Sequence, residues 1–216
     1  MSGPPTAGYG FRLVARQGAA RAGVLTTPHG EVPTPTFMPV GTQGSVKSLS
    51  PEEVSATGAR IVLGNTYHLW IRPGADVIAQ LGGLHAMSRW PHAMLTDSGG
   101  FQAFSLTSLT KLTEDGFEFR SHLDGARMKL TPEEAMRVQG LIGADIAMQL
   151  DVCPPGMADR PTLVASVERT TRWAERCLRA RRPDQAVFGI VQGGTDVGLR
   201  RQHARTLSSM PFDGLA

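Results

Sequence analysis

The sequence lacks the residues that mark disulfide-rich, zinc-knuckle and membrane proteins. Its two cysteines, Cys153 and Cys177, are too few for a disulfide framework or a four-cysteine zinc site, and they indicate a reducing cytoplasmic setting. The N-terminus, MSGPPTAGYGF, has no apolar core of the signal-peptide type. No uninterrupted apolar run reaches transmembrane length, so we expect no membrane partner.

The chain also lacks a strong charge imbalance, a low-complexity segment and an internal linker. Its 22 basic and 19 acidic residues give a formal net charge of +3, which permits a polyanionic partner but does not require one. With 216 residues, 41% of them hydrophobic, the chain can bury one sizeable core. The composition therefore favours one globular domain.

Helix starts are marked twice by the same residue pattern. Ser50 can cap a helix that has Pro51 at its first position and Glu53 closing a capping box, and Thr131 opens the same pattern. Further helices are expected at about residues 73–81, 161–181 and 195–210.

Strand-like apolar runs alternate with these helices, and a polar residue follows each run: Asn65, Asp97, Asp151 and Gln192. Such alternation predicts an α/β fold with a parallel sheet covered by helices. Open sheets and barrels of this class both carry their sites at the carboxyl ends of the strands. A closed barrel needs eight strands, and about five are present with this alternation, so the chain looks cut short.

Two segments interrupt the alternation and predict antiparallel strands. Residues 11–40 form extended runs around a turn at His29-Gly30. Residues 111–130 carry Asp115-Gly116 and Asp124-Gly125 between extended stretches, which is a strong hairpin signal. We expect residues 1–10 to form a disordered tail ahead of a single domain at 11–216.

The segment AMLTDSGGFQAFS holds polar residues that the interior of a strand does not need. Asp97, Ser98, Gly99 and Gly100 suit a turn, and an aspartate can also cap the following helix. Two adjacent glycines followed by Phe101 favour a ligand site instead, because glycines let backbone N–H groups approach a ligand closely.

The other strand-end residues have structural interpretations as well as functional ones. Asp151 follows a buried-strand pattern, so its carboxylate must be solvated, paired or used, and a salt bridge or a cap competes with a binding role. Gln192 precedes two glycines that suit a strand-to-helix turn, and Asn65 is a residue type that is common in turns. Cys153 is most simply a small buried residue.

Together these groups suit a flat purine. A carboxylate accepts two adjacent N–H groups, as guanine presents at N1 and its 2-amino group, while an amide or a backbone N–H donates to O6. Phe101 can stack on the base, and the second carboxylate is left for proton transfer. Several other ligands would also fit. A barrel enzyme that acts on small phosphorylated metabolites is a further alternative, but it needs a phosphate site near the last strands of a barrel, which are not in this chain.

Seven segments, in this order, resemble one family: GNTYHL, LTDSGGFQAFSL, GFEFRSHLDG, LTPEEAMRVQ, QLDVCPP, RTTRWAERC and FGIVQGG. The chain resembles the tRNA-guanine transglycosylases, also called queuine tRNA-ribosyltransferases, from about residue 11 to residue 216. The resemblance implies a (β/α)8 TIM barrel that is incomplete here, with about the first five strand–helix units. Residues 11–216 would then be a partial barrel domain whose C-terminal part is missing.

The resemblance also implies a reaction, in which guanine at the anticodon wobble position of tRNA is exchanged for a 7-deazaguanine through a covalent ribosyl-enzyme intermediate. It assigns the role of proton acceptor to Asp97. It further implies two groups of site residues: a substrate-binding group of Asp97, Ser98, Gly99, Gly100, Phe101, Asp151 and Gln192, and a possible pocket group of Asn65, Gln102 and Cys153.

The partners implied by the resemblance are the tRNA anticodon loop, guanine and 7-aminomethyl-7-deazaguanine, with a cytoplasmic homodimer when the protein is complete. The family's nucleophilic aspartate and the ligands of its structural Zn²⁺ lie beyond residue 216, so we expect no metal ligand and no turnover from this chain alone. The alternative is a non-catalytic partner subunit that binds base or tRNA.

Overall fold

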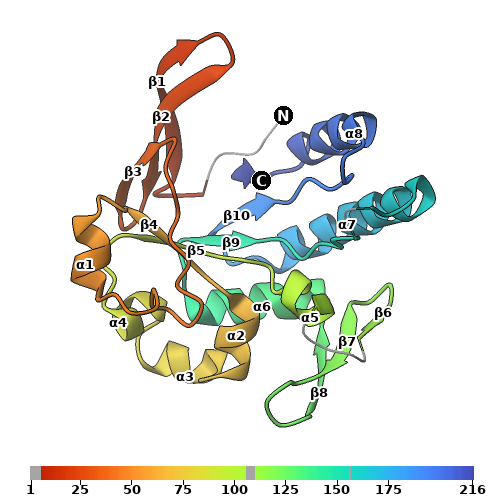
Figure 1. Ribbon diagram of the computed structural model, residues 1–216, viewed down its shortest axis with the longest axis horizontal. Coiled ribbons are helices and arrows are strands. Elements are labelled where there is room, and N and C mark those ends of the chain that lie inside the picture. The colour runs from red at the N-terminus through yellow and green to blue at the C-terminus, as the bar shows by residue number, and fades with distance from the viewer. Residues whose placement is uncertain (1–5, 106–109, 156) are drawn as a thin grey trace.

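A parallel five-stranded sheet forms the centre of the molecule (Figure 1). The computed structural model describes residues 6–105, 110–155 and 157–216. The strand order is β11-β10-β9-β5-β4, and every neighbouring pair is parallel. The strands are β4 (Ile61–Gly64), β5 (Ala93–Thr96), β9 (Ile146–Met148), β10 (Ala186–Gly189) and β11 (Gly214–Leu215). Each strand of this sheet therefore lies beside the next one along the chain, which confirms the predicted parallel α/β arrangement.

Helices fill the connections between these strands. The predicted helices are found as α1 (Pro51–Ala56), α3 (Ala75–Gln80), α6 (Pro132–Ile142), α7 (Arg160–Ala180) and α8 (Val197–Ser208). Three short helices were not predicted: α2 (Thr66–Ile71), α4 (Leu84–Ser88) and α5 (Gly100–Ser105). Neither α2 nor α4 has a side-chain hydrogen bond at its N-cap: the N-cap of α4 is Gly83, and the Asn65 side chain before α2 binds Asp97 instead. None of the helices in the described ranges is both long enough and apolar enough to cross a membrane.

The two predicted capping patterns are confirmed. The Ser50 hydroxyl accepts from the Glu53 N–H, and the Glu53 carboxylate accepts from the Ser50 N–H in return. The Thr131 hydroxyl caps α6 by accepting from the Glu134 N–H, and Gly143 ends that helix at a φ of 74°.

Both predicted antiparallel segments are also present. Near the N-terminus, β1 (Gly10–Gln17), β2 (Ala20–Thr27) and β3 (Gly30–Thr34) form one sheet, with the expected turn at His29 between β2 and β3. The hairpin insertion contains β6 (Lys111–Leu112), β7 (Phe117–Arg120) and β8 (Arg127–Leu130), joined by the two Asp-Gly turns. The two sheets project from the parallel sheet in different directions (Figure 1).

The structure differs from the expected tail at residues 6–10. The Thr6 N–H donates to the Asp213 carboxylate at 2.9 Å, and the Tyr9 hydroxyl donates to the Asp145 carbonyl at 2.6 Å. Gly10 already belongs to β1. Both contacts join residues more than 100 positions apart, so the pattern of apolar residues near the N-terminus could not predict them. Residues 1–5 lie outside the described residues.

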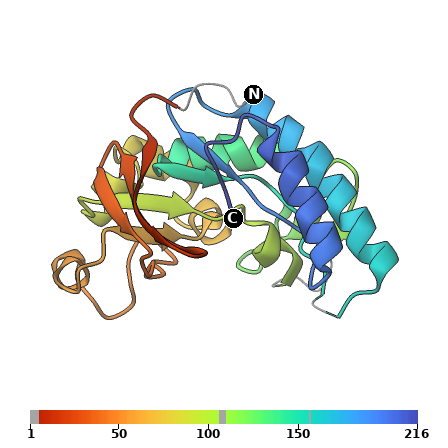
Figure 2. The ribbon, with the colours of Figure 1, turned by 90° about the horizontal axis from the view of Figure 1, so that it is seen from above.

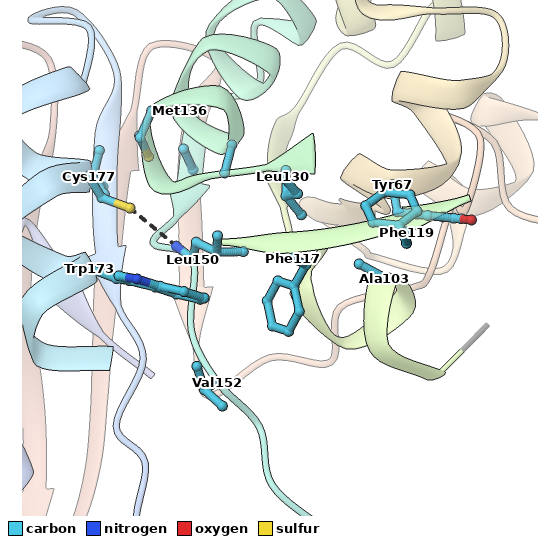
Figure 3. Packing of buried hydrophobic residues seen from close by; sticks show 13 residues of the cluster. Tyr67, Ala103, Phe117, Phe119, Leu130, Met136, Leu150, Val152, Trp173 and Cys177 are labelled. Atoms are coloured by element: carbon cyan, nitrogen blue, oxygen red, sulfur yellow. Dashed lines mark hydrogen bonds between the residues drawn. The ribbon is translucent and has the colours of Figure 1, made fainter. Parts of the chain in front are cut away.

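The two faces of the parallel sheet bury different clusters. On one face α6 and α7 pack over a cluster that also holds the hairpin residues Phe117 and Phe119 (Figure 3). The other face is filled by residues of the strands themselves, and Val32 from β3 joins it. Figure 2 shows α7 and α8 running side by side along one flank of the sheet.

Helix α7 anchors the hairpin insertion. Trp173 on α7 is fully buried, packs edge-on against Phe117 with ring centres 5.5 Å apart, and donates from Nε1 to the Glu114 carbonyl at 2.8 Å. Arg169 and Arg172 bind the Glu114 carboxylate, whose pKa their hydrogen bonds lower to about 2. A single helix thus fixes the position of the insertion relative to the sheet.

We predict that Trp173→Ala lowers the free energy of unfolding by about 3–5 kcal/mol, because it leaves a large cavity at the hairpin junction and removes the hydrogen bond from Nε1 to the Glu114 carbonyl. Denaturant unfolding followed by circular dichroism measures this loss. Glu175→Ala on the same helix is the control: this side chain is 60% exposed, and its removal should change stability by no more than about 0.5 kcal/mol. Equal losses in the two variants would contradict the anchoring role of Trp173.

Candidate functional site

The four strand-end residues gather at the carboxyl edge of the parallel sheet. Asn65 and Asp97 directly follow β4 and β5, while Asp151 and Gln192 come shortly after β9 and β10. Asn65 donates to the Asp97 carboxylate, and Gln192 donates to the Asp151 carboxylate. Ser98 links the two pairs, because it follows Asp97 in the chain and its hydroxyl donates to Asp151 at 2.9 Å. The structure thus brings together all four residues in one hydrogen-bonded network.

Asp97 accepts a hydrogen bond at each of its four lone-pair positions. Its Oδ1 accepts from the backbone N–H groups of Thr66 at 2.8 Å and Gly99 at 3.2 Å. Its Oδ2 accepts from the side-chain amides of Asn65 at 2.5 Å and Gln102 at 3.0 Å. Because a carboxylate has about four such positions, this arrangement fills its acceptor capacity.

The pKa of Asp97 is raised, because burial penalises its charged form by more than the four hydrogen bonds favour it. A carboxylate with a raised pKa is a stronger base than an exposed one. The environment therefore suits Asp97 to accepting a proton.

Asp151 is more deeply buried, with 6% of the residue exposed. Its Oδ1 accepts from the Ser98 hydroxyl at 2.9 Å, and its Oδ2 accepts from the Gln192 amide at 2.6 Å. Burial raises the pKa of Asp151, and the nearby charge of Asp97 adds to this rise. Each oxygen has one lone pair that these two bonds do not use, so Asp151 can accept two further N–H groups.

The glycine pair after Ser98 is required by the backbone path. Gly99 has a φ of 77°, which favours glycine, and its N–H points to Asp97. A Cβ on Gly100 would lie 3.1 Å from the Asp151 carbonyl oxygen, closer than nearly all real contacts. The two glycines thus let the segment after β5 pass directly against the segment after β9.

The remaining predicted site residues lie around this network. Phe101 on α5 is 58% exposed, and Gln102 on the same helix is partly buried with its Oε1 free of any partner among the described residues. The expectation that Cys153 is buried is wrong: Cys153 is exposed in the loop after β9, whereas Cys177 on α7 is the buried cysteine. Cys153 nevertheless lies close to the network, because the charge of Asp151 contributes to raising its pKa, after the larger effect of burial.

Two contributors to the network, Thr66 and His203, were missed from the sequence, as was a separate contact between Tyr67 and His122. Thr66 binds Asp97 twice, through its N–H and through its hydroxyl, which donates to the Asp97 carbonyl at 2.6 Å. His203 on α8 is 1% exposed, and its Nδ1 accepts from the Gln192 N–H at 2.8 Å. The Tyr67 hydroxyl lies 2.8 Å from Nδ1 of His122 in the hairpin insertion. Only the GNTYHL segment pointed to a role for Thr66, and no residue pattern near His203 predicted its contact with Gln192.

Comparison with known proteins agrees with this geometry. Residues 16–216 match the family model described as Queuine tRNA-ribosyltransferase. The chain is 72% identical over 211 residues to a queuine tRNA-ribosyltransferase of Sorangium cellulosum (strain So ce56), covering 98% of this chain and 54% of that protein. It is 54% identical over 210 residues to the protein of the same name from Halalkalibacterium halodurans, covering 96% of this chain and 55% of that protein.

The chain spans about half the length of the curated relatives it matches. The match nevertheless includes β4 to β11 and every residue of the hydrogen-bonded network at the sheet edge. On this evidence the chain belongs to the queuine tRNA-ribosyltransferase family.

Proposed function

We propose that this chain supplies the base-binding residues of a tRNA-guanine transglycosylase. Such an enzyme exchanges guanine at the anticodon wobble position of tRNA for a 7-deazaguanine, with 7-aminomethyl-7-deazaguanine as the incoming base. The reaction passes through a covalent ribosyl-enzyme, whose nucleophile we assign to residues beyond 216. The chain alone would then bind the base without turnover.

The observation that carries this proposal is the link between two buried carboxyl groups through Ser98. Each oxygen of Asp151 accepts one side-chain hydrogen bond and keeps a second lone pair, and two such acceptors match the N1–H and 2-amino groups of guanine. The Gln192 amide uses one of its two hydrogens on Asp151, so the other can donate to O6 of the base. Phe101, which is 58% exposed, is available to stack on the ring.

Asp97 serves in this proposal as the proton acceptor. One of its four hydrogen bonds must first be released. Gln102 is the side-chain donor that we expect to leave, because its bond of 3.0 Å is longer than the 2.5 Å bond from Asn65. Its amide is held by the single bond from Nε2 to Asp97 at 3.0 Å, whereas Thr66 and Gly99 donate from the backbone. Displacing Gln102 exposes a lone pair of Oδ2 to an incoming proton.

The wider assignments belong to the same proposal. The sequential, all-parallel strand order supports an incomplete (β/α)8 barrel. Cys153 in an exposed loop and Cys177 buried on α7 do not form a sulfur-rich zinc site, so we place the ligands of the structural Zn²⁺ beyond residue 216. The anticodon loop of tRNA, a homodimer and a cytoplasmic location complete the proposal. The alternative of a subunit without turnover gains no support from relatives named as ribosyltransferases.

We predict that Asp151→Asn weakens guanine binding by on the order of 10- to 100-fold, because an amide presents a donor where the base also presents one. Isothermal titration calorimetry of guanine into the full-length enzyme, which includes the residues beyond 216, measures this change. Asp115→Asn is the control, because this carboxylate is 70% exposed in the hairpin insertion. Unchanged guanine affinity in Asp151→Asn would remove the base-reading role.

We predict that Asp97→Asn slows guanine exchange by roughly 10²- to 10⁴-fold while affecting tRNA affinity much less, because the variant cannot accept the proton. Since burial raises the pKa of Asp97, the wild-type rate should fall as the pH drops through that raised value. Incorporation of labelled guanine into tRNA across a pH series, together with a tRNA-binding measurement, tests both statements. Loss of tRNA binding with chemistry intact would show that the two aspartates have other roles.

A further inference from the structure

Three side chains with metal-binding atoms converge at the amino edge of the parallel sheet. They are His29 in the turn between β2 and β3, His85 on α4, and Asp145 directly before β9, and their ligand atoms all lie within 4.8 Å of one another. Strand β9 runs from Ile146 toward Asp151, so Asp145 and the carboxyl-edge network lie at opposite ends of this strand. The cluster is therefore separate from the proposed base site.

Asp145 is the buried centre of this cluster, with 1% of its side chain exposed. Its Oδ1 lies 2.7 Å from Nδ1 of His29, and its Oδ2 lies 3.1 Å from Nε2 of His85. Within the described part of the chain, these two imidazoles are the only groups that form ion-pair contacts with Asp145. A buried carboxylate needs a positive partner or strong hydrogen bonds, and no lysine or arginine among these residues supplies one.

The two imidazoles are arranged as a pair. Their rings stack with centres 3.6 Å apart and planes 10° from parallel, so both present a nitrogen to the same carboxylate. Ligand atoms around a tetrahedral Zn²⁺ stand about 3.3 Å apart, given bonds of about 2.0–2.1 Å. The two distances from the Asp145 oxygens to the imidazole nitrogens are slightly shorter than this, and all three ligand atoms lie within 4.8 Å of one another. The His29 side chain is 40% exposed, so it has room to tilt toward a shared ion.

Neighbouring groups hold the carboxylate in place. The Met94 N–H donates to Oδ2 of Asp145 at 2.8 Å, and the Tyr9 hydroxyl donates to the Asp145 main-chain carbonyl. Such outer contacts orient the ligands of metal sites. On its open side, the cluster faces a surface pocket that His29 and Asp145 line together with Tyr9 and Arg182, so water can reach a bound ion.

We propose that His29, His85 and Asp145 bind one divalent transition-metal ion, with water completing its coordination. Two imidazoles and one carboxylate match the three-ligand zinc sites and the facial triad of iron enzymes, whereas Mg²⁺ and Ca²⁺ prefer oxygen ligands alone. The bound ion joins the N-terminal antiparallel sheet, α4 and the start of β9. It replaces the hydrogen bonds that now link these side chains and the contact of 3.1 Å between Nε2 of His85 and the His92 carbonyl oxygen. Neither the ligands nor the location are those that the resemblance assigns to the family's structural Zn²⁺.

The test uses the 216-residue chain, stripped of metal with a chelator and titrated with Co²⁺ and Zn²⁺. We expect one ion per chain, visible d–d absorption from four- or five-coordinate Co²⁺, and a rise in melting temperature with Zn²⁺, because an ion that binds only the folded chain stabilises it by mass action. His29→Ala should weaken binding by roughly 100-fold or more. This variant changes a half-exposed turn residue, so it avoids the risk of misfolding that Asp145→Asn carries.

His122→Ala in the hairpin insertion is the matched control and should bind Co²⁺ as the wild type does. Mg²⁺ titrated in the same way should give no rise in melting temperature. Failure of Co²⁺ and Zn²⁺ to bind would overturn the proposal, as would binding that His29→Ala leaves unchanged. Neither outcome bears on base recognition, which is measured by guanine affinity at the other edge of the sheet.

Discussion

Two carboxylates buried side by side at one sheet edge are the constraint on which the site depends. Burial raises the pKa of both Asp97 and Asp151, so each must be supplied with donors if it is to stay charged. The donors come from every neighbouring segment: the start of α2, the Gly99 N–H, the Ser98 hydroxyl and the Gln192 amide. Supplying these donors brings the chain at Gly100 close to Asp151. It also directs the first N–H of α2, that of Thr66, to the Asp97 carboxylate.

Much of the fold follows from short-range signals in the sequence. Ser50 and Thr131 fix helix starts through their own hydroxyl groups, and the Asp-Gly pairs fix both turns of the hairpin insertion. The alternation of apolar runs with helices then specifies a parallel sheet, and the carboxyl ends of parallel strands must share one edge. For this reason the meeting of Asn65, Asp97, Asp151 and Gln192 could be predicted without coordinates.

What could not be predicted depends on contacts between distant residues. Thr66 and His203 act through backbone or ring atoms whose partners lie 31 and 11 residues away, and a pattern of residue types does not encode such geometry. The exposure of Cys153 depends on where the loop after β9 turns. The attachment of Thr6 to Asp213 spans 207 residues. The three helices that were missed have only five or six residues each, too few to show a helical period in the sequence.

The two carboxylates differ in a way that orders the proposed reaction. Asp151 keeps two unused lone pairs, so it can bind the N–H edge of a base without breaking any bond in the network. Asp97 has no unused lone pair and must lose a donor before it accepts a proton. Gln102 makes the longer of the two side-chain bonds to Asp97, 3.0 Å against 2.5 Å for Asn65. In the proposed reaction Asp151 can therefore bind the base while the network is intact, and Asp97 accepts a proton only after one of its donors has left.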